Sequence, residues 1–182
     1  MMDGRDGIVS EKCREKALRL LEMRPHASGE IRLKLRKNRD FPPAVIEEII
    51  SDFTRVGLLN DRQFVALFCE EKKSAMTPPG RYKVALALRR KGLPADIINE
   101  VMAEVWDRHD GLTDDDGNFD DDGLSPELAR AIRAATPKWQ SLCRRAEPSP
   151  QLRVKLMRFL AGRGYAGDII RQAIDRVCCQ RE

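Results

Sequence analysis

The sequence predicts an all-α protein built from three tandem three-helix repeats that form an elongated, curved array. Three observations support this prediction. Apolar residues recur at helical spacing in three separate segments, the ten prolines fall at breaks between helical segments, and the order of basic helix, basic turn and apolar helix occurs three times. The apolar segments contain β-branched residues, but none of them alternates with period two, so strands are not expected.

The apolar segments are the third helices of the repeats, and each follows the spacing i, i+3, i+4, i+7. Gly57 follows the first of them as a C′ residue that ends the helix. The three segments contain Val45, Ile46, Ile49, Ile50, Phe53 and Val56; Ile97, Ile98, Val101, Met102 and Val105; and Ile169, Ile170, Ala173, Ile174 and Val177.

Each apolar helix is preceded by a basic helix that ends in Leu and a short basic turn, at Leu35, Leu88 and Leu160. The first helices of the repeats are expected at 11–23, 61–73 and 127–145, the last interrupted at Pro137. The repeats then span 9–56, 57–108 and 125–182, after a disordered N-terminus at 1–8. A repeat of about 50 residues buries too little surface to be stable alone, so neighbouring repeats are expected to stack.

Charge is distributed unevenly along the chain. The 33 basic and 29 acidic residues give a net charge of +4. Residues 107–122 hold eight aspartates and one arginine, a local charge of −7, which leaves +11 for the remainder. Residues 109–124 are therefore expected to form a flexible acidic insertion between the second and third repeats.

Composition excludes several classes of protein. No apolar run approaches the roughly 18–20 residues that span a bilayer, and the N-terminus lacks the apolar region of a secretory signal. We expect no membrane association and a cytoplasmic location. The odd number of cysteines, scattered without a CxxC pair among apolar neighbours, indicates reduced buried thiols rather than a disulfide framework or a zinc site. They are Cys13, Cys69, Cys143, Cys178 and Cys179.

Catalytic constellations are sparse, and no catalytic residue, cofactor or metal ligand is predicted. His26 and His109 lie at a helix break and in the acidic insertion, where a lone histidine is usually a surface residue. The glycines at 162, 164 and 167 follow a helix rather than a strand, which excludes a dinucleotide-binding loop. An EF-hand aligned on Gly123 would require a bidentate glutamate at Ala129, so a specific calcium site is not expected.

The basic second helices are the most informative feature for function. If the repeats stack, the cations at equivalent positions of the second helices would align along one side of the protein. They would form a basic stripe that is suited to binding a long polyanion, a filament or an acidic protein. The basic stripe comprises Arg32, Lys34, Arg36, Lys37, Arg81, Lys83, Arg89, Arg90, Lys91, Arg153, Lys155, Arg158 and Arg163.

Two other classes of protein remain as alternatives. In a helix-turn-helix DNA-binding protein, 28–37 and 43–56 would form the pair, but the second helix carries Glu47, Glu48 and Asp52, the wrong sign for a major groove. A nuclease or calcium-regulated enzyme could use the aspartates of the insertion, but the chain lacks a rigid carboxylate cluster.

Five segments, in order and spacing, resemble the RecX family of regulators of the RecA recombinase. Two of them match the family patterns Ala-Leu-x-x-Leu and Gly-Leu-Leu-x-Asp-x-x-Phe, and two others resemble the family's Ser-x-x-Glu-Leu-x-x-Lys-Leu and Phe-Leu-x-x-Arg-Gly-Phe. The remaining one, Gly80-Arg81 followed by Leu88–Leu93, is similar to the family's Leu-Arg-x-Lys-Gly-Ile. The matching segments are Ala17–Leu21, Ser28–Leu35, Gly57–Phe64, Gly80–Leu93 and Phe159–Tyr165.

The resemblance implies tandem three-helix repeats, a cytoplasmic location and binding in the groove of RecA–DNA filaments. Binding there would inhibit or modulate ATP hydrolysis and strand exchange, with a role in recombination, DNA repair and the SOS response. The resemblance implies no catalytic residues. We expect the RecA filament as the partner, single- or double-stranded DNA as a further ligand, and a monomeric protein.

The acidic insertion generates a prediction. Residues 110–123 carry seven aspartates and only Leu112 and Phe119 to bury, so they cannot offset the entropy of ordering. A tethered polyanion competes with DNA for nearby basic helices. Replacing the insertion with a Gly/Ser linker of equal length should leave thermal stability unchanged and tighten DNA binding at low salt. A salt titration of both proteins tests this, and equal affinity at low salt would make the insertion a passive spacer.

Overall fold

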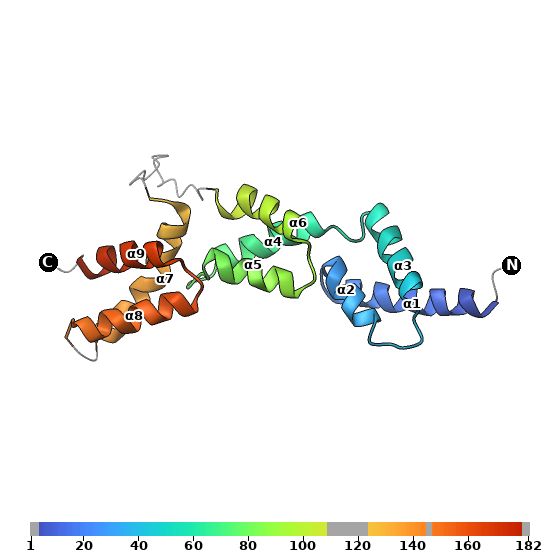
Figure 1. Ribbon diagram of the computed structural model, residues 1–182, viewed down its shortest axis with the longest axis horizontal. Helices are drawn as coiled ribbons and strands as arrows, with labels where there is room; N and C mark the ends of the chain where they lie inside the picture. Colours follow the sequence, from blue (N-terminus) through green and yellow to red (C-terminus); the bar gives the residue numbers. More distant parts are fainter. Residues whose placement is uncertain (1–3, 109–123, 145–146, 180–182) are drawn as a thin grey trace. The chain divides into compact units, whose positions relative to one another are not determined.

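The computed structural model describes residues 4–108, 124–144 and 147–179, and within these ranges every regular element is helical (Figure 1). The prediction of an all-α protein is confirmed. Residues 109–123 of the acidic insertion lie outside the described residues. In chain order the elements are α1 (Gly4–Met23), α2 (Ser28–Leu35), α3 (Pro43–Arg55), α4 (Asp61–Lys73), α5 (Arg81–Arg90), α6 (Ala95–Val101), η1 (Met102–Trp106), α7 (Pro126–Cys143), α8 (Pro150–Gly162) and α9 (Gly167–Cys179).

The chain divides into two compact units. The N-terminal unit comprises residues 1–67 and 87–99, and the C-terminal unit comprises 68–86 and 100–182. The boundaries fall within α4, α5 and α6, so each helix of the second predicted repeat contributes residues to both units.

The core of the N-terminal unit lies between α1, α2 and α3. The apolar stripe of α3 predicts this packing, since Ile46, Ile49, Ile50 and Phe53 are all buried. Gly57, with φ of +79°, ends the segment as expected. The buried residues of this core are Cys13, Ala17, Ile31, Leu35, Phe41, Ile46, Ile49, Ile50, Phe53 and Leu59.

The start of α1 corrects one expectation from the sequence. The sequence predicts disorder for residues 1–8, but residues 4–8 belong to α1, and residues 1–3 lie outside the described residues. Val9 packs against the core one helical turn before the buried Cys13, so the buried face of α1 begins earlier than the sequence pattern suggested. The helix extends beyond Val9 toward the N-terminus because elongation of an existing helix adds one hydrogen bond for each residue fixed.

The core of the C-terminal unit lies between α7, α8 and α9, which pack against one another (Figure 1). Helix α7 corrects a second expectation, because it runs without interruption through Pro137. An interior proline removes a backbone hydrogen bond and costs about 3 kcal/mol. Ala134, Ala135 and Trp139 flank the proline and are buried, and their burial offsets that cost.

The segment after α6 is a π-helix, which the sequence pattern did not predict. The N–H of Asp107 donates to the carbonyl oxygen of Met102, 3.0 Å away, so the last turn closes five residues back rather than four. Trp106, at the end of this turn, is completely buried. The wider turn directs Trp106 into the C-terminal unit, where its indole reaches Glu127.

The cysteines only partly follow the prediction. All five are free thiols, and Cys13 and Cys69 are buried as expected. Cys143 and Cys178 are half-buried, and Cys179 is exposed. The prediction of uniform burial is wrong at the end of α9, because consecutive residues of a helix point about 100° apart and cannot both face the core.

Candidate partner-binding surface

Backbone contact between two glycines fixes the position of the basic turn after α5 in the N-terminal unit. A Cβ placed on Gly29, in the first turn of α2, would lie only 2.6 Å from Cα of Gly92. Gly92 closes the basic turn after α5 with φ of +77°, a conformation that glycine adopts without strain. Residues with side chains at these two positions would push α2 and the turn apart.

Charged side chains stabilise the same junction. Glu30 accepts hydrogen bonds from Lys91 at 3.0 Å and from Arg24 at 3.1 Å. The backbone N–H and the hydroxyl of Ser28 donate to the two carboxylate oxygens of Asp61, at 2.8 and 2.6 Å. Glu30 of α2 and Asp61 of α4 therefore accept hydrogen bonds from the donors that gather at the start of α2.

The two cations hold Glu30 in its ionised form. Burial by itself raises the pKa of Glu30, but the hydrogen bonds and charges of Arg24 and Lys91 outweigh burial and lower its pKa to about 2. Only 14% of the Glu30 side chain is exposed, so its ion pair with Lys91 is largely shielded from solvent. Lys91 also lies over the ring of Phe64, 5.4 Å from its centroid.

A matching junction occurs in the C-terminal unit. A Cβ placed on Gly80, directly before α5, would lie 2.6 Å from the backbone nitrogen of Tyr165. The N–H of Gly80 donates to the carbonyl oxygen of Arg163 at 2.8 Å, and the hydroxyl of Tyr165 donates to the carbonyl oxygen of Pro78 at 2.9 Å. The Arg163 guanidinium donates to the carbonyl oxygen of Thr77. The basic turn after α8 is therefore fixed to the start of α5.

Glu127 forms a second set of contacts in this unit. Its carboxylate accepts from the backbone N–H of Arg81 at 2.8 Å, from Nε1 of Trp106 at 3.0 Å and from the Arg130 guanidinium at 3.2 Å. Sequence reasoning missed Glu127 and Trp106. The sequence signal that could have indicated Glu127 is its place as an acidic residue in the first turn of α7. Asp61 occupies the same place in α4.

The structure separates the predicted basic stripe into two groups. Members of the first group have partners within the chain. Arg32 and Arg36 bind Glu47, Lys34 contacts His26, Arg81 binds Asp107, Lys83 donates to the Gly162 carbonyl oxygen, Lys91 binds Glu30, and Arg163 donates to the Thr77 carbonyl oxygen. These contacts hold the cations against their own unit.

Members of the second group are exposed and have no ion pair among the described residues. We call them the outward cations: Lys37, Arg89 and Arg90 in the N-terminal unit, and Lys155 and Arg158 in the C-terminal unit. Arg153 is also exposed and borders a cavity beside α8. Helices α5 and α8 contain no acidic residue, so the outward cations on them have no intrahelical counter-charge.

His26 has a structural role. It is 4% exposed, its Nδ1 lies 2.8 Å from the carbonyl oxygen of Arg24, and its Nε2 lies 2.7 Å from Nζ of Lys34. Burial lowers the pKa of His26, and the nearby cations add to this effect, so the neutral ring accepts the Lys34 proton donor. His109 lies outside the described residues.

The described residues hold neither a metal cluster nor a membrane-spanning helix. They contain no group of three or more His, Cys, Asp or Glu side chains arranged to hold a metal ion. Likewise, none of the described helices is long and apolar enough to cross a membrane.

Comparisons with known proteins agree with this fold. Residues 13–53 match the model of the first three-helix domain of RecX, and residues 126–174 match that of the third three-helix domain. "Regulatory protein RecX" of Chlorobium phaeobacteroides (strain BS1) is 30% identical over 92% of this chain and 94% of its own length. The protein of the same name from Chlorobaculum tepidum is 32% identical over 88% of this chain and 85% of its own length.

Solved structures give the same result for the fold. The crystal structure of RecX from Lactobacillus salivarius superposes with a TM-score of 0.71 at 19% identity, covering 94% of this chain and 98% of that one. A second crystal structure of regulatory protein RecX gives a TM-score of 0.68 at 15% identity, covering 92% of this chain and 72% of that one.

The glycine junctions predict a contrast between two substitutions. Gly80→Ala introduces a methyl group into backbone contact and should destabilise the protein by about 1–3 kcal/mol. Gly162→Ala is the matched control, because a Cβ at Gly162, the last residue of α8, meets nothing within 4 Å. The control should be neutral or slightly stabilising. Urea unfolding of both variants measures the difference, and equal stabilities would contradict the role assigned to the junction.

Glu30 predicts a pH dependence. Its pKa of about 2 in the folded protein lies below the ordinary value of 4.5, so its stabilising contribution is complete above 4.5 and is lost as the pH falls toward 2. Glu30→Gln should remove this part of the acid sensitivity. Urea unfolding between pH 6 and pH 2 measures it, with the exposed Glu48→Gln as the control. Parallel stability curves for wild type and Glu30→Gln would show that the ion pair contributes nothing.

Proposed function

The chain belongs to the RecX family, and from that premise we propose that it is a non-enzymatic cytoplasmic regulator that binds the RecA–DNA filament. Binding inhibits or modulates RecA ATP hydrolysis and strand exchange, and so acts in recombination, DNA repair and the SOS response. One observation carries the proposal: a chain of this family presents outward cations on helices that hold no acidic residue. The curated relatives are named as regulatory proteins, which supports a role without catalysis.

The outward cations are suited to a filament of protein and nucleic acid. Both phosphate groups and carboxylates pair with exposed arginines, and pairing with DNA releases counterions, so the affinity falls as salt rises. Arg89 and Arg90 occupy the last turn of α5, immediately before the turn that the glycine junction fixes. Their backbone positions are therefore set before any partner binds, which lowers the entropic cost of association.

The helix-turn-helix alternative receives no comparable support. Glu47, on the helix that would enter the major groove, binds Arg32 at 2.8 Å and Arg36 at 3.2 Å. These contacts neutralise two cations of the first helix and leave the second helix acidic. Phosphate contacts by Arg32 or Arg36 would therefore require breaking an ion pair with Glu47.

The proposed function predicts the effect of charge reversal. Arg89→Glu with Arg90→Glu, or Lys155→Glu with Arg158→Glu, should weaken binding to RecA filaments by at least about tenfold and flatten its salt dependence. Exposed charges change stability by less than about 0.5 kcal/mol each, so folding should be unaffected. Lys91 and Arg163 are left unchanged, because they belong to the junctions. RecA ATPase on single-stranded DNA and filament binding by anisotropy are the measurements.

The matched control is Arg171→Glu with Arg176→Glu on α9, which makes the same change in net charge at exposed positions outside the basic stripe. This variant should inhibit RecA as well as wild type does. If an excess of the wild-type protein leaves RecA ATPase, filament length and filament turnover unchanged, the proposed function is wrong. If the control loses as much affinity as the reversed pairs, net charge rather than a defined surface determines binding.

A further inference from the structure

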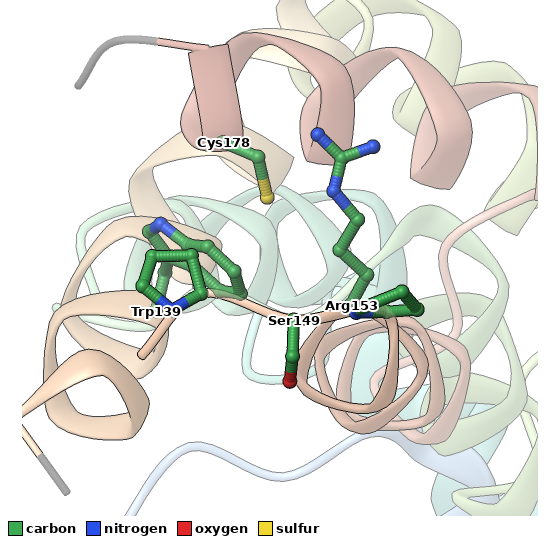
Figure 2. Close-up of a pocket in the computed structure, with 6 residues that line it drawn as sticks. Trp139, Ser149, Arg153 and Cys178 are labelled. Carbon is green, nitrogen blue, oxygen red and sulfur yellow. The ribbon is translucent and has the colours of Figure 1, made fainter. Parts of the chain in front are cut away.

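The C-terminal unit contains a cavity that the proposed function does not use. It has a volume of about 390 Å³ and lies between the ends of three helices, with walls that are mostly apolar. Trp139 of α7, Cys178 of α9 and Arg153 of α8 line it, together with Pro148, Ser149 and Pro150 at the start of α8. In Figure 2 the Cys178 sulfur points into the space between Trp139 and Arg153, and the Ser149 hydroxyl points away from both.

The nitrogen groups of the side chains that line the cavity, those of Arg153 and Trp139, are donors. Arg153 is the one charged residue among those that line it, and no acidic side chain is among them. Trp139 is 3% exposed, and its indole N–H has no acceptor within the described residues. Burial raises the pKa of the Cys178 thiol despite the nearby Arg153 cation, so the sulfur remains a neutral, apolar part of the wall. The cavity is therefore suited to an apolar group accompanied by an anion.

The exposed face of α8 continues this surface. Met157 lies one turn beyond Arg153 on the same side of the helix, and Val154 lies one turn before Arg158. Met157 is 44% exposed and Val154 is 42% exposed, so both leave apolar surface accessible on this face of α8. Cations and apolar side chains thus alternate around one exposed helix face that begins at the cavity.

We propose that the cavity and the exposed face of α8 bind an acidic protein segment with an aromatic anchor. The aromatic side chain occupies the space between Trp139, Cys178 and Arg153. Carboxylates that follow it along the segment pair with Arg153 and Arg158, and its aliphatic atoms contact Val154 and Met157. Charge complementarity favours this occupant, since α8 carries three cations and no acidic residue.

The apolar side chains favour protein over nucleic acid as the occupant. A phosphate backbone pairs with the arginines and leaves Met157, Val154 and the cavity without a partner, whereas a peptide buries all of them. The inference rests on the proposed function in one respect, namely that the partner of this regulator is a protein assembly. The assay below contains no RecA, so either proposal can fail while the other stands.

The test uses a fluorescein-labelled octapeptide with one phenylalanine followed by three aspartates, and measures binding to the full chain by anisotropy. Two matched peptides replace the phenylalanine with alanine or the aspartates with asparagines, and both should bind at least about tenfold more weakly. Cys178→Leu, which fills the cavity, and Arg153→Glu should weaken binding of the first peptide to the same extent. Arg176→Glu is the control, because it lies on the opposite side of α9 from Cys178.

A second measurement requires no substitution. Bound peptide should protect Cys178 of the wild-type protein from iodoacetamide, with the adjacent exposed Cys179 as the internal reference in peptide mass mapping. Equal protection of both cysteines, or equal binding of the phenylalanine and alanine peptides, would overturn the proposal. A single-stranded oligonucleotide that protects Cys178 and loses affinity in Cys178→Leu would make this a nucleic-acid site and would also overturn it.

Discussion

The backbone contacts at Gly29–Gly92 and Gly80–Gly164 are the constraint on which the rest of the structure depends. A three-helix repeat of about 50 residues buries too little apolar surface to be stable by itself, so its contacts with the next repeat are part of its folding free energy. At each contact the start of a second helix meets the basic turn of the following repeat without intervening side chains. Close approach then brings donors and acceptors into hydrogen-bonding range, as between Gly80 and Arg163.

The junctions also determine which cations are available to a partner. Lys91 and Arg163 lie in the turns at the junctions, and they bind Glu30 and the Thr77 carbonyl oxygen. Arg89 and Arg90, in the turn of helix just before, face solvent. One run of basic residues therefore serves two purposes, stabilising the contact between repeats and presenting charge beside it. Net charge along the sequence overstates the binding surface, because a cation that is paired with an anion of its own chain contributes little to an external field.

The sequence predicted the structural features that depend on local periodicity. It did not predict the features that depend on contacts between residues far apart in the chain. The stripe of α3 and the turn at Gly57 follow from apolar spacing and glycine chemistry. The π-helix at Met102–Trp106 and the uninterrupted α7 at Pro137 depend instead on burial in the C-terminal unit, which overrides local preference. The roles of Glu30 and Glu127 were missed because their partners lie 61 and 46 residues away in sequence. Helical spacing cannot relate residues at such separations.

The proposed binding surface differs between the two units in its chemistry. Arg89 and Arg90 adjoin a fixed turn, where charge supplies the recognition. On α8 the outward cations lie among exposed apolar side chains and beside a cavity, where charge can orient a partner and apolar contact can retain it. Charge pairs at an exposed surface weaken with salt, whereas burial of apolar area does not. A filament-binding regulator with both kinds of surface would therefore lose its charge-dependent contacts first as salt rises, while the apolar contacts of α8 persist.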